Sequence, residues 1–566
     1  MTIRGADQPP LRTAEVVLVN GKIRTPAHPS GFVRAMAIGG GIIRALGDDE
    51  DIRPLTGRRT RVVDLRGRLA IPAFGDAHIH PVQGGLDGKR CTLLGARSGP
   101  ECLNEIAVYS ASLPAGAWVL GGGWSPTAFP SGAPAAGDLD KATGRRPAFL
   151  TSRDRHSAWV NTAALHAAGI TGRTPDPPDG RIERDPSGAP SGTLHAGAVR
   201  LVADQVPAPT RAELTDALMS AQKFLHSVGI TSVQDACVGE AGEIGIPDTF
   251  GTYLQAASDR KLTMRVTGAL WWDRNRGLDQ IDRLLARRAA AEGSGYFRAT
   301  TVKLMLDGVC ETLTAAMSSP YLDGHGRVTS HYGNLFIDPA ELVEAANRLS
   351  DHGFQLHFHA VGDRAVTAAL DAVESLPRPA RDAARHHIAH LRFVRPEDLE
   401  RFSRAGVVAT FQPLWACDDE RNHELTVPFV GPQRAAWQYR IGGVFRRAGR
   451  VAFGSDWPVS SPNPLQEMHV AVNRMLSTRL GRPGAPETSR PLLLAEAIPV
   501  DAALHAFTAG VAHVNHEDHV AGTLRPGMLA DVVVLDRDIY AVPPSTIGDT
   551  SVAMTIASGQ VVHGDE

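Results

Sequence analysis

The chain has 566 residues, of which 43% are apolar and 21% charged, and its formal net charge is -3. This size and composition are those of an ordinary globular protein with room for more than one domain, which argues against a mainly disordered chain. Because lysine and arginine are scattered and the net charge is small, we expect neither nucleic acid nor a membrane surface as a partner.

The N-terminal segment, MTIRGADQPPLRTAEVVLVNGK, contains no apolar run long enough for a signal peptide or a membrane span, so we expect a cytoplasmic protein. The five cysteines, at positions 91, 102, 237, 310 and 417, are widely spaced and form no CxxC pair. Neither a disulfide framework nor a thiolate metal site is indicated. Any metal is therefore expected to bind histidine and carboxylate side chains.

Both ends of the chain have the pattern of short strands. Residues 14–70 alternate β-branched runs with turns, as in AEVVLVNGK and TRVVDLRGRLAIP, and predict a small antiparallel β unit. The C-terminal segments GTLRPGMLADVVVLD and SVAMTIASGQVVHG repeat this pattern. Because neither end alone has enough strands to bury a face, we expect residues 1–70 and 513–566 to build one β-sandwich domain together.

Residues 71–512 alternate apolar, strand-like runs with amphipathic helical stretches such as 210–229 and 338–353. The helical stretches open with Ser, Thr, Asp or Pro and close with glycine, as helix ends do. Eight βα units predict an α/β fold built as a (β/α)8 TIM barrel. The eight predicted strands are 69–78, 230–236, 263–271, 299–306, 354–361, 386–391, 407–412 and 450–456.

Residues 82–209 do not fit one barrel unit, because they are rich in Gly, Pro and Ser and too numerous for a simple loop. We predict a long insertion after the first barrel strand. Loops at the C-terminal ends of barrel strands carry the active site, so the insertion is expected to form a lid or a wall of the substrate pocket.

The stretch FGDAHIHP, residues 74–81, ends the first predicted barrel strand with two histidines. His78 and His80 are two positions apart, so in a strand both side chains point to the same face, into the barrel. Two neutral imidazoles side by side can hold a metal ion. An isolated pair of this kind is also explained by hydrogen bonds in a loop, so the interpretation depends on the other strand ends.

Three further polar residues stand at the C-terminal ends of predicted strands: His359 in QLHFHAVGD, His390 in HHIAHLR and Asp456 in FGSDWPV. A barrel places its catalytic groups at this edge, so these side chains and the first histidine pair are predicted to converge. Nitrogen and oxygen ligands without thiolates are typical of a catalytic zinc site. His357 and His386 share the inward orientation but stand earlier in their strands, so we expect them in the core or beside the ligands.

Lys303, in TTVKLMLDG, is a cation within the apolar run of the fourth predicted strand. A buried ammonium beside a metal ion is repelled unless it loses its proton. One solution is carboxylation by carbon dioxide, which gives an anionic carbamate able to bridge two metals. The alternative is a lysine paired with Asp307 or Glu311, and spacing alone does not decide between the two.

Together, the segments FGDAHIHP, VKLMLDG, HFHAVGDRA, HIAHL and FGSDWPV resemble those of the metal-dependent amidohydrolase superfamily. Within it, the chain resembles amidohydrolase family 3, which has an HAxGDxA segment on strand five, and KLMLDGVCETLTAA is similar to the matching segment of N-substituted formamide deformylases. The resemblance implies six residues that bind one or two Zn²⁺ ions, or another divalent metal: His78, His80, Lys303, His359, His390 and Asp456.

By position, the resemblance implies that His78 and His80 bind one ion with Asp456, that the other two histidines bind a second, and that carboxylated Lys303 bridges both. Asp456 is then also the catalytic general base and acid. It takes a proton from the metal-activated hydroxide as it attacks and passes the proton to the leaving amine.

Six further residues, near these motifs or in aromatic segments such as GGGW, are candidates for contact with the substrate: Trp124, His156, Glu311, Gln412, Trp415 and Trp457. The aromatic residues among them can equally belong to the core. If several line the site, and because no paired arginine clamp is apparent, we expect a small apolar or aromatic amide rather than a dicarboxylate.

These interpretations predict a zinc-dependent amidohydrolase that hydrolyses the C–N bond of an amide, an N-substituted formamide or a carbamate. Two alternatives stay open. One is a mononuclear metal-dependent deaminase or cyclic amide hydrolase with Lys303 uncarboxylated, and the other is a non-catalytic scaffold with the amidohydrolase fold. Large barrels of the superfamily are often dimers or tetramers, so the resemblance also implies a homodimer or homotetramer.

Overall fold

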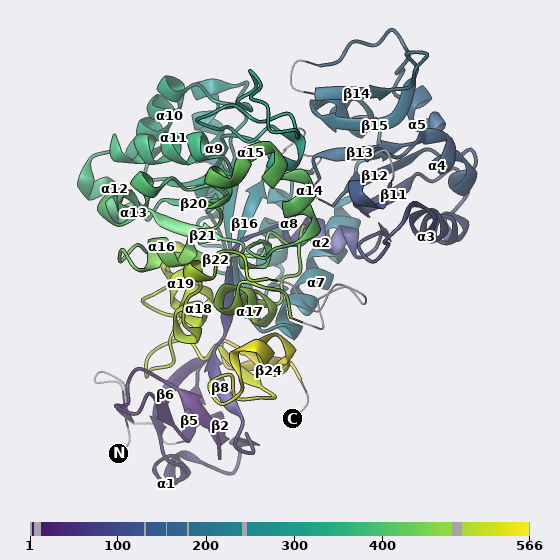
Figure 1. Cartoon of the computed structure of the whole chain (residues 1–566). Coiled ribbons are helices and arrows are strands. Elements are labelled where there is room, and N and C mark those ends of the chain that lie inside the picture. Colours follow the sequence, from purple (N-terminus) through teal and green to yellow (C-terminus); the bar gives the residue numbers. More distant parts are fainter. Residues whose placement is uncertain are drawn as a thin grey trace.

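The computed structural model describes residues 3–4, 13–129, 132–153, 155–177, 180–239, 246–477 and 490–564. Figure 1 shows a central barrel, with the insertion to one side and the sheets formed near the two chain ends below it. None of the helices within the described ranges is long and apolar enough to cross a membrane.

The barrel consists of eight hydrogen-bonded strands, each parallel to its neighbour. The two end strands of this sheet meet at their C-terminal ends, where the Asp456 N–H donates to the His78 carbonyl at 2.7 Å and the His80 N–H donates to the Trp457 carbonyl at 2.9 Å. The result is a nearly closed barrel, consistent with the predicted fold. In chain order the strands are β9 (Phe74–Ile79), β16 (Ile230–Val238), β17 (Arg265–Trp271), β18 (Phe297–Met305), β19 (Gln355–Ala360), β20 (His387–His390), β21 (Val408–Phe411) and β22 (Val451–Phe453).

The first predicted strand, 69–78, is wrong in one respect, because two strands occupy it. Residues Leu69–Pro72 form β8, which pairs with β23 (Val532–Leu535) and β3 (Lys22–Arg24) outside the barrel. Only β9 pairs with β16 in the barrel. Both halves are buried, so the apolar run continues across the break and composition gives no sign of it.

The helices that cover the barrel form for local reasons. Helix α7 (Arg211–Ser227) begins with a capping box, in which the Thr210 hydroxyl accepts from the Glu213 N–H and the Glu213 carboxylate accepts from the Thr210 N–H. Its buried apolar residues recur every three or four positions and face the barrel core. The other main covering helices are α8 (Phe250–Ser258), α9 (Ile281–Ala291), α10 (Pro339–Asp351), α11 (Asp363–Glu374), α13 (Leu399–Ala405), α16 (Ile441–Phe445), α17 (Pro464–Asn473), α18 (Val500–Phe507) and α19 (Ala509–Val514).

The insertion builds a sheet of its own, in the order β10-β11-β12-β13-β15-β14. The first three strands are parallel and the others antiparallel, and α3 (Gly99–Ser112), α4 (Ala136–Thr143) and α5 (Thr162–Ala167) pack on them. It begins with α2 (Pro81–Asp87), which packs on α7. The strands are β10 (Cys91–Thr92), β11 (Val119–Trp124), β12 (Ala148–Ser152), β13 (Ser157–Val160), β14 (Gly180–Arg184) and β15 (Pro190–Ala196).

Two further sheets lie near the chain ends, and one of them joins strands from both termini. The predicted antiparallel pairing is wrong in part, because β2 (Val16–Val19) pairs parallel with β7 (Arg61–Asp64), and β3 pairs parallel with β8. Side chains of both sheets share one buried cluster, which includes Leu18 and Val532. The sheet orders are β1-β6-β5-β2-β7 and β25-β24-β23-β8-β3-β4, with β1 (Ile3–Arg4), β4 (Phe32–Val33), β5 (Ala35–Gly39), β6 (Ile42–Gly47), β24 (Val552–Ala557) and β25 (Gln560–His563).

Candidate metal centre

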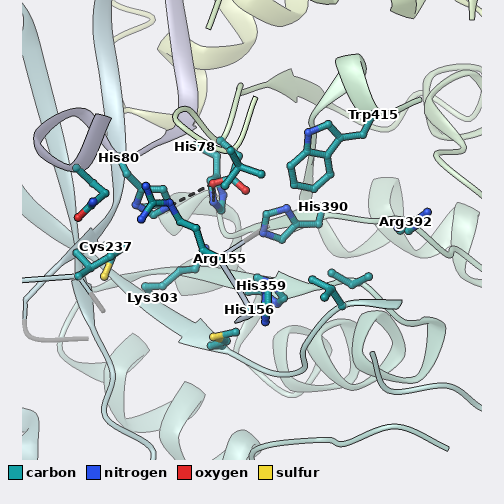
Figure 2. Close-up of a pocket in the computed structure, with 18 of the residues that line it drawn as sticks. His78, His80, Arg155, His156, Cys237, Lys303, His359, His390, Arg392 and Trp415 are labelled. Carbon is teal, nitrogen blue, oxygen red and sulfur yellow. Dashed lines mark ion pairs between the residues drawn. The ribbon is translucent and has the colours of Figure 1, made fainter. Parts of the chain in front are cut away.

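A cavity of about 120 Å³ lies at the C-terminal ends of the barrel strands. Figure 2 shows imidazoles from several strands converging on it, together with Lys303 and Arg155. All six predicted metal ligands line this cavity, as do three of the predicted substrate residues: His78, His80, Lys303, His359, His390 and Asp456, with His156, Glu311 and Trp415.

The Asp456 carboxylate lies between two imidazoles. Its Oδ1 is 3.1 Å from His80 Nε2 and 3.4 Å from His78 Nε2. Burial opposes ionisation of Asp456, but the two histidines prevail and hold the pKa of its carboxyl well below the usual value. Ligands on one tetrahedral zinc ion lie about 3.4 Å from one another, so these contacts have the spacing of a shared metal site.

One group of ligand atoms combines residues that were predicted to bind different ions. Ligand atoms of His78, His390 and Asp456 all lie within 4.8 Å of one another. His390 was expected to bind the second ion with His359, yet it lies as a neighbour of the first group. The His359 ring in turn lies 4.3 Å from the His390 ring, so the ligands predicted for the two ions are neighbours, as sites that share a bridging group require.

A chain of hydrogen bonds orients His78. The Gln234 side-chain oxygen lies 2.8 Å from His357 Nδ1, which places the proton on that nitrogen and leaves His357 Nε2 as an acceptor. His357 Nε2 lies 2.9 Å from His78 Nδ1, so His78 donates there and keeps the lone pair of its Nε2 for the Asp456 side. Burial and then the charge of Lys303 lower the pKa of His78 to about 3, so the imidazole is neutral, as a metal ligand must be.

His390 is oriented in the same way. Its Nδ1 lies 3.0 Å from the Gln412 side-chain oxygen, which leaves Nε2 free to bind an ion. The Trp415 indole stacks parallel to the His390 ring, with centroids 5.5 Å apart, and donates to the Ser460 hydroxyl at 3.1 Å. Gln412 was predicted to contact the substrate, but it lies behind His390 and is not among the described residues that line the cavity.

The outer nitrogens of two histidines lie near carboxylates. His80 Nδ1 is 3.8 Å from Asp235 Oδ1, and His359 Nδ1 is 3.3 Å from Asp307 Oδ1. Metal-ligating imidazoles commonly have a carboxylate on the side away from the ion, which leaves Nε2 as the ligand atom. Neutral imidazoles and a carboxylate, without thiolates, are the donor set that zinc and similar divalent ions take in catalytic sites.

Lys303 contacts neither of the acidic residues named as its alternative partners. Asp307 instead accepts from the backbone N–H groups of Ala316, Val361 and Gly362, and Glu311 pairs with another residue. The Lys303 ammonium nitrogen lies 3.3 Å from the Nε2 of the imidazole beneath it, at position 357. Burial lowers the pKa of Lys303 to about 7, so a large fraction of the side chain is an uncharged amine at neutral pH.

Asp76 joins the strand of the histidine pair to the segment that carries Asp456. Its carboxyl accepts from the His78 N–H at 3.0 Å, from the Ser455 N–H at 3.1 Å and from the Ser455 hydroxyl at 2.6 Å. Burial raises the pKa of Asp76 to about 7. These bonds hold the first and the last barrel strands in register at the metal cluster.

Comparison with known proteins agrees with this geometry. The sequence model of the amidohydrolase family matches residues 61–563. The chain belongs to the amidohydrolase family. This confirms the resemblance stated from the motifs, and with it a metal-dependent hydrolase that acts on carbon–nitrogen bonds other than peptide bonds.

Three relatives of this amidohydrolase span nearly its whole length. Protein LONG AFTER FAR-RED 3 of Arabidopsis thaliana is 30% identical over 544 residues, which cover 95% of this chain and 90% of that protein. N-substituted formamide deformylase of Arthrobacter pascens is 24% identical over 566 residues, 96% of this chain and 97% of the deformylase. An uncharacterized metal-dependent hydrolase from Pyrococcus furiosus has a crystal structure that superposes with a TM-score of 0.70 at 26% identity, covering 92% of this chain and 99% of that one.

Three predicted substrate residues of the amidohydrolase have other surroundings than expected. Glu311 lines the cavity but is neutralised by Arg392, whose guanidinium donates to it at 2.5 Å. The expectation for Trp124 is wrong, because its indole is buried in the core of the insertion and donates to the Leu150 carbonyl at 2.8 Å. Trp457 lines a neighbouring cavity instead of this one.

Sequence reasoning missed several residues of the amidohydrolase that line the cavity or, like Asp235, lie beside its ligands. Asp235 and Cys237 stand at the C-terminal end of β16, and Asp235 accepts from the Tyr253 hydroxyl at 2.7 Å beside His80. The rule that identified the other strand ends also applies to this strand and would have found Asp235. Arg155, which belongs to the insertion, offered only its position next to His156 as a signal.

Proposed function

We propose that this amidohydrolase cuts the C–N bond of an N-substituted formamide, an amide or a carbamate whose nitrogen carries an apolar or aromatic group. The observation that carries the proposal is the Asp456 carboxylate, buried between His78 and His80 at the base of a cavity and held ionised. The formamide deformylase among the relatives supports the substrate class.

The residues that would hold one or two divalent ions, most simply zinc, are the four histidines and Asp456, with carboxylated Lys303 as the bridge between two ions. A bound ion of this kind supplies Lewis acidity, which polarises a carbonyl oxygen and makes water a stronger acid. The uncharged fraction of Lys303 is the form that carbon dioxide can carboxylate.

The chain's own groups move the proton and exclude bulk water. Asp456 accepts the proton of the attacking water at its carboxylate and donates it to the leaving nitrogen, which must be protonated to depart as an amine. Gln412 keeps His390 in the tautomer that leaves Nε2 available, and Gln234 does the same for His78 through His357. The Trp415 indole forms an apolar wall over His390, which restricts access of bulk water to that side.

A second candidate is a mononuclear deaminase or cyclic amide hydrolase. It is favoured by the close grouping of His78, His390 and Asp456, which one ion could satisfy without Lys303. Metal content measured after gel filtration separates the two. About two ions per chain support the first proposal, whereas one ion is compatible with both candidates, which the release of an amine from a formamide or an amide then separates.

The direct test is Asp456→Asn in zinc-loaded protein, with benzylamine release from N-benzylformamide, N-benzylacetamide and methyl N-benzylcarbamate as the assay. We expect turnover to fall by roughly 100- to 10,000-fold, because the amide cannot accept the proton. Circular dichroism reports the fold, and Asp138→Asn, on the exposed face of α4, is the matched control.

Near-normal turnover in Asp456→Asn would remove Asp456 from the mechanism. A wild-type protein that holds no metal, releases no amine from any of these compounds and is unaffected by a chelator would support the non-catalytic scaffold instead.

A further inference from the structure

A second cavity, of about 440 Å³, lies between the barrel and the insertion. Its walls are α2 and α7, strands β10, β11 and β12 of the insertion with the loops that follow them, and the segment after β22. The GGGW segment contributes Gly122 and Gly123 to this wall, while the tryptophan of that segment points into the core. Figure 1 shows α2 and α7 on the side of the barrel that faces the insertion.

The two cavities are lined by neighbouring residues at two positions and share one residue at a third. Gln83 lines the metal cavity and Gly84 the second one; Asp456 lines the first and Trp457 the second. Arg155 lines both cavities. The second cavity is therefore a direct neighbour of the metal cluster.

Arg155 stands at this junction in an unusual backbone conformation. Its φ is 63°, in the left-handed region that favours glycine. Its guanidinium donates a hydrogen bond to the carboxylate of Asp87 in α2. Because it lines both cavities, the Arg155 side chain is the group that a molecule occupying both would contact at their junction.

The second cavity has an apolar mouth. Phe224 and Leu94 line it and are 43% and 47% exposed, although most large apolar side chains of this protein are buried. The Phe224 ring lies 5.4 Å from the Trp457 ring. A Cβ atom on Gly84 would approach a Trp457 ring carbon to 2.4 Å, so the absence of a side chain at Gly84 lets the indole lie flat against α2.

The volumes of the two cavities indicate that different parts of a substrate occupy them. The metal cavity, about 120 Å³, is smaller than the 300–1,000 Å³ or so of sites that hold a whole drug-sized ligand. A formyl, acyl or carbamoyl group beside the ligands uses much of this space, so we place a ring substituent outside it. The second cavity, about 440 Å³, reaches that range.

We propose that the second cavity binds the ring-bearing apolar substituent on the nitrogen of the substrate, while the carbonyl end occupies the metal cavity. In this arrangement the substrate crosses from one cavity to the other beside Arg155, which lines both. This inference rests on the proposed hydrolysis of a C–N bond and specifies which part of the molecule determines specificity.

The test compares N-benzylformamide with N-methylformamide in zinc-loaded wild type, Ser220→Trp and Phe224→Ala. Ser220 is on α7 and lines the second cavity, so an indole there fills it at a distance from the metal ligands. We expect kcat/KM for the benzyl compound to fall roughly 10- to 100-fold in Ser220→Trp and roughly 3- to 10-fold in Phe224→Ala. The methyl compound should change less than about 2-fold, because it does not reach the second cavity.

Phe445→Ala is the matched control, since Phe445 is 42% exposed, like Phe224, but lines neither cavity among the described residues. Isothermal titration of N-benzylformamide into metal-free protein gives a reading that does not depend on turnover. Binding should weaken in Ser220→Trp and be unchanged in Phe445→Ala.

Equal loss for both substrates in Ser220→Trp, or no loss for either, would overturn the inference while the proposed function stands. If the wild type cleaves neither compound nor the amide and carbamate analogues, the proposed function itself fails. In that case, calorimetric binding of the benzyl compound that Ser220→Trp abolishes would still support the second cavity as a binding site.

Discussion

At the scale of single residues, glutamine side chains fix the tautomers of His390, which belongs to the cluster, and of two histidines behind it. Gln234 accepts from His357 at 2.8 Å and from His387 at 2.8 Å, and Gln412 accepts from His390 at 3.0 Å. An amide oxygen accepts a hydrogen bond without adding charge, so it sets the tautomer of a neutral imidazole. The strand-end rule found the imidazoles from the sequence, but not these partners, which come from other strands.

Gln412→Leu should weaken metal binding, because His390 loses the acceptor that holds its proton on Nδ1. We expect roughly 10- to 100-fold weaker zinc affinity, measured by competition with a chromophoric chelator. Gln412→Glu keeps an acceptor oxygen and should retain most of the affinity. Equal affinities in wild type and Gln412→Leu would show that Gln412 does not orient the ligand.

At the scale of elements, the contact of α2 with α7 positions one wall of both cavities. A Cβ atom on Gly85 would lie 2.0 Å from the Ala217 carbonyl oxygen, so the two helices meet backbone to backbone. This approach also sets the positions of Gln83 and Gly84, which face the two cavities. The glycines of GGLDG therefore serve close packing, which composition alone does not distinguish from a loop.

Gly85→Ala should separate α2 from α7 and destabilise the protein by about 1–3 kcal/mol, as overpacking does. The thermal unfolding midpoint by calorimetry is the measurement. Gly137→Ala is the control, because Gly137 lies within helix α4 with open space around its Cα, and alanine there should stabilise by up to about 1 kcal/mol. An unchanged midpoint for Gly85→Ala would mean that the helices can move apart at no cost.

The burial of strands on both faces explains where the strand predictions succeeded and where they failed. Parallel barrel strands are buried on both faces, so their apolar runs stand out in the sequence and their order follows the chain. The same rule failed for residues 69–78, because β8 is equally apolar but pairs with strands outside the barrel. Hydrogen-bond partners, not composition, decide to which sheet such a strand belongs.

At the scale of the whole molecule, the barrel interior holds many neutral histidines. Burial lowers the pKa of His386 to about 3, and its Nδ1 accepts from the Leu356 N–H at 3.0 Å, which a protonated ring could not do. Burial also lowers the pKa of His357 and His387 well below 6.5. Each of these histidines therefore binds fewer protons in the folded chain than in the unfolded chain below about pH 6.5, and we expect them together to outweigh Asp76, whose raised pKa acts in the opposite direction.

Stability of the chelator-treated protein should consequently fall as the pH decreases from about 7 to about 5, by up to about 1.4 kcal/mol per pH unit for each such histidine. The sign follows because each folded pKa lies below the unfolded value of 6.5. Thermal unfolding midpoints at a series of pH values measure it. His386→Asn keeps an acceptor and removes one titrating group, so its midpoint should fall less steeply; a midpoint independent of pH would contradict the prediction.

The sequence by itself determined the family, the barrel and the six cluster residues, because parallel strands bring their C-terminal ends to one rim wherever they lie in the chain. The tertiary structure decided which imidazole nitrogen faces Asp456, which residues lie behind the ligands, and that Arg155 lines two neighbouring cavities. These features depend on contacts between side chains that are distant along the chain. Periodicity and motif spacing describe single segments and so carry no information about such contacts.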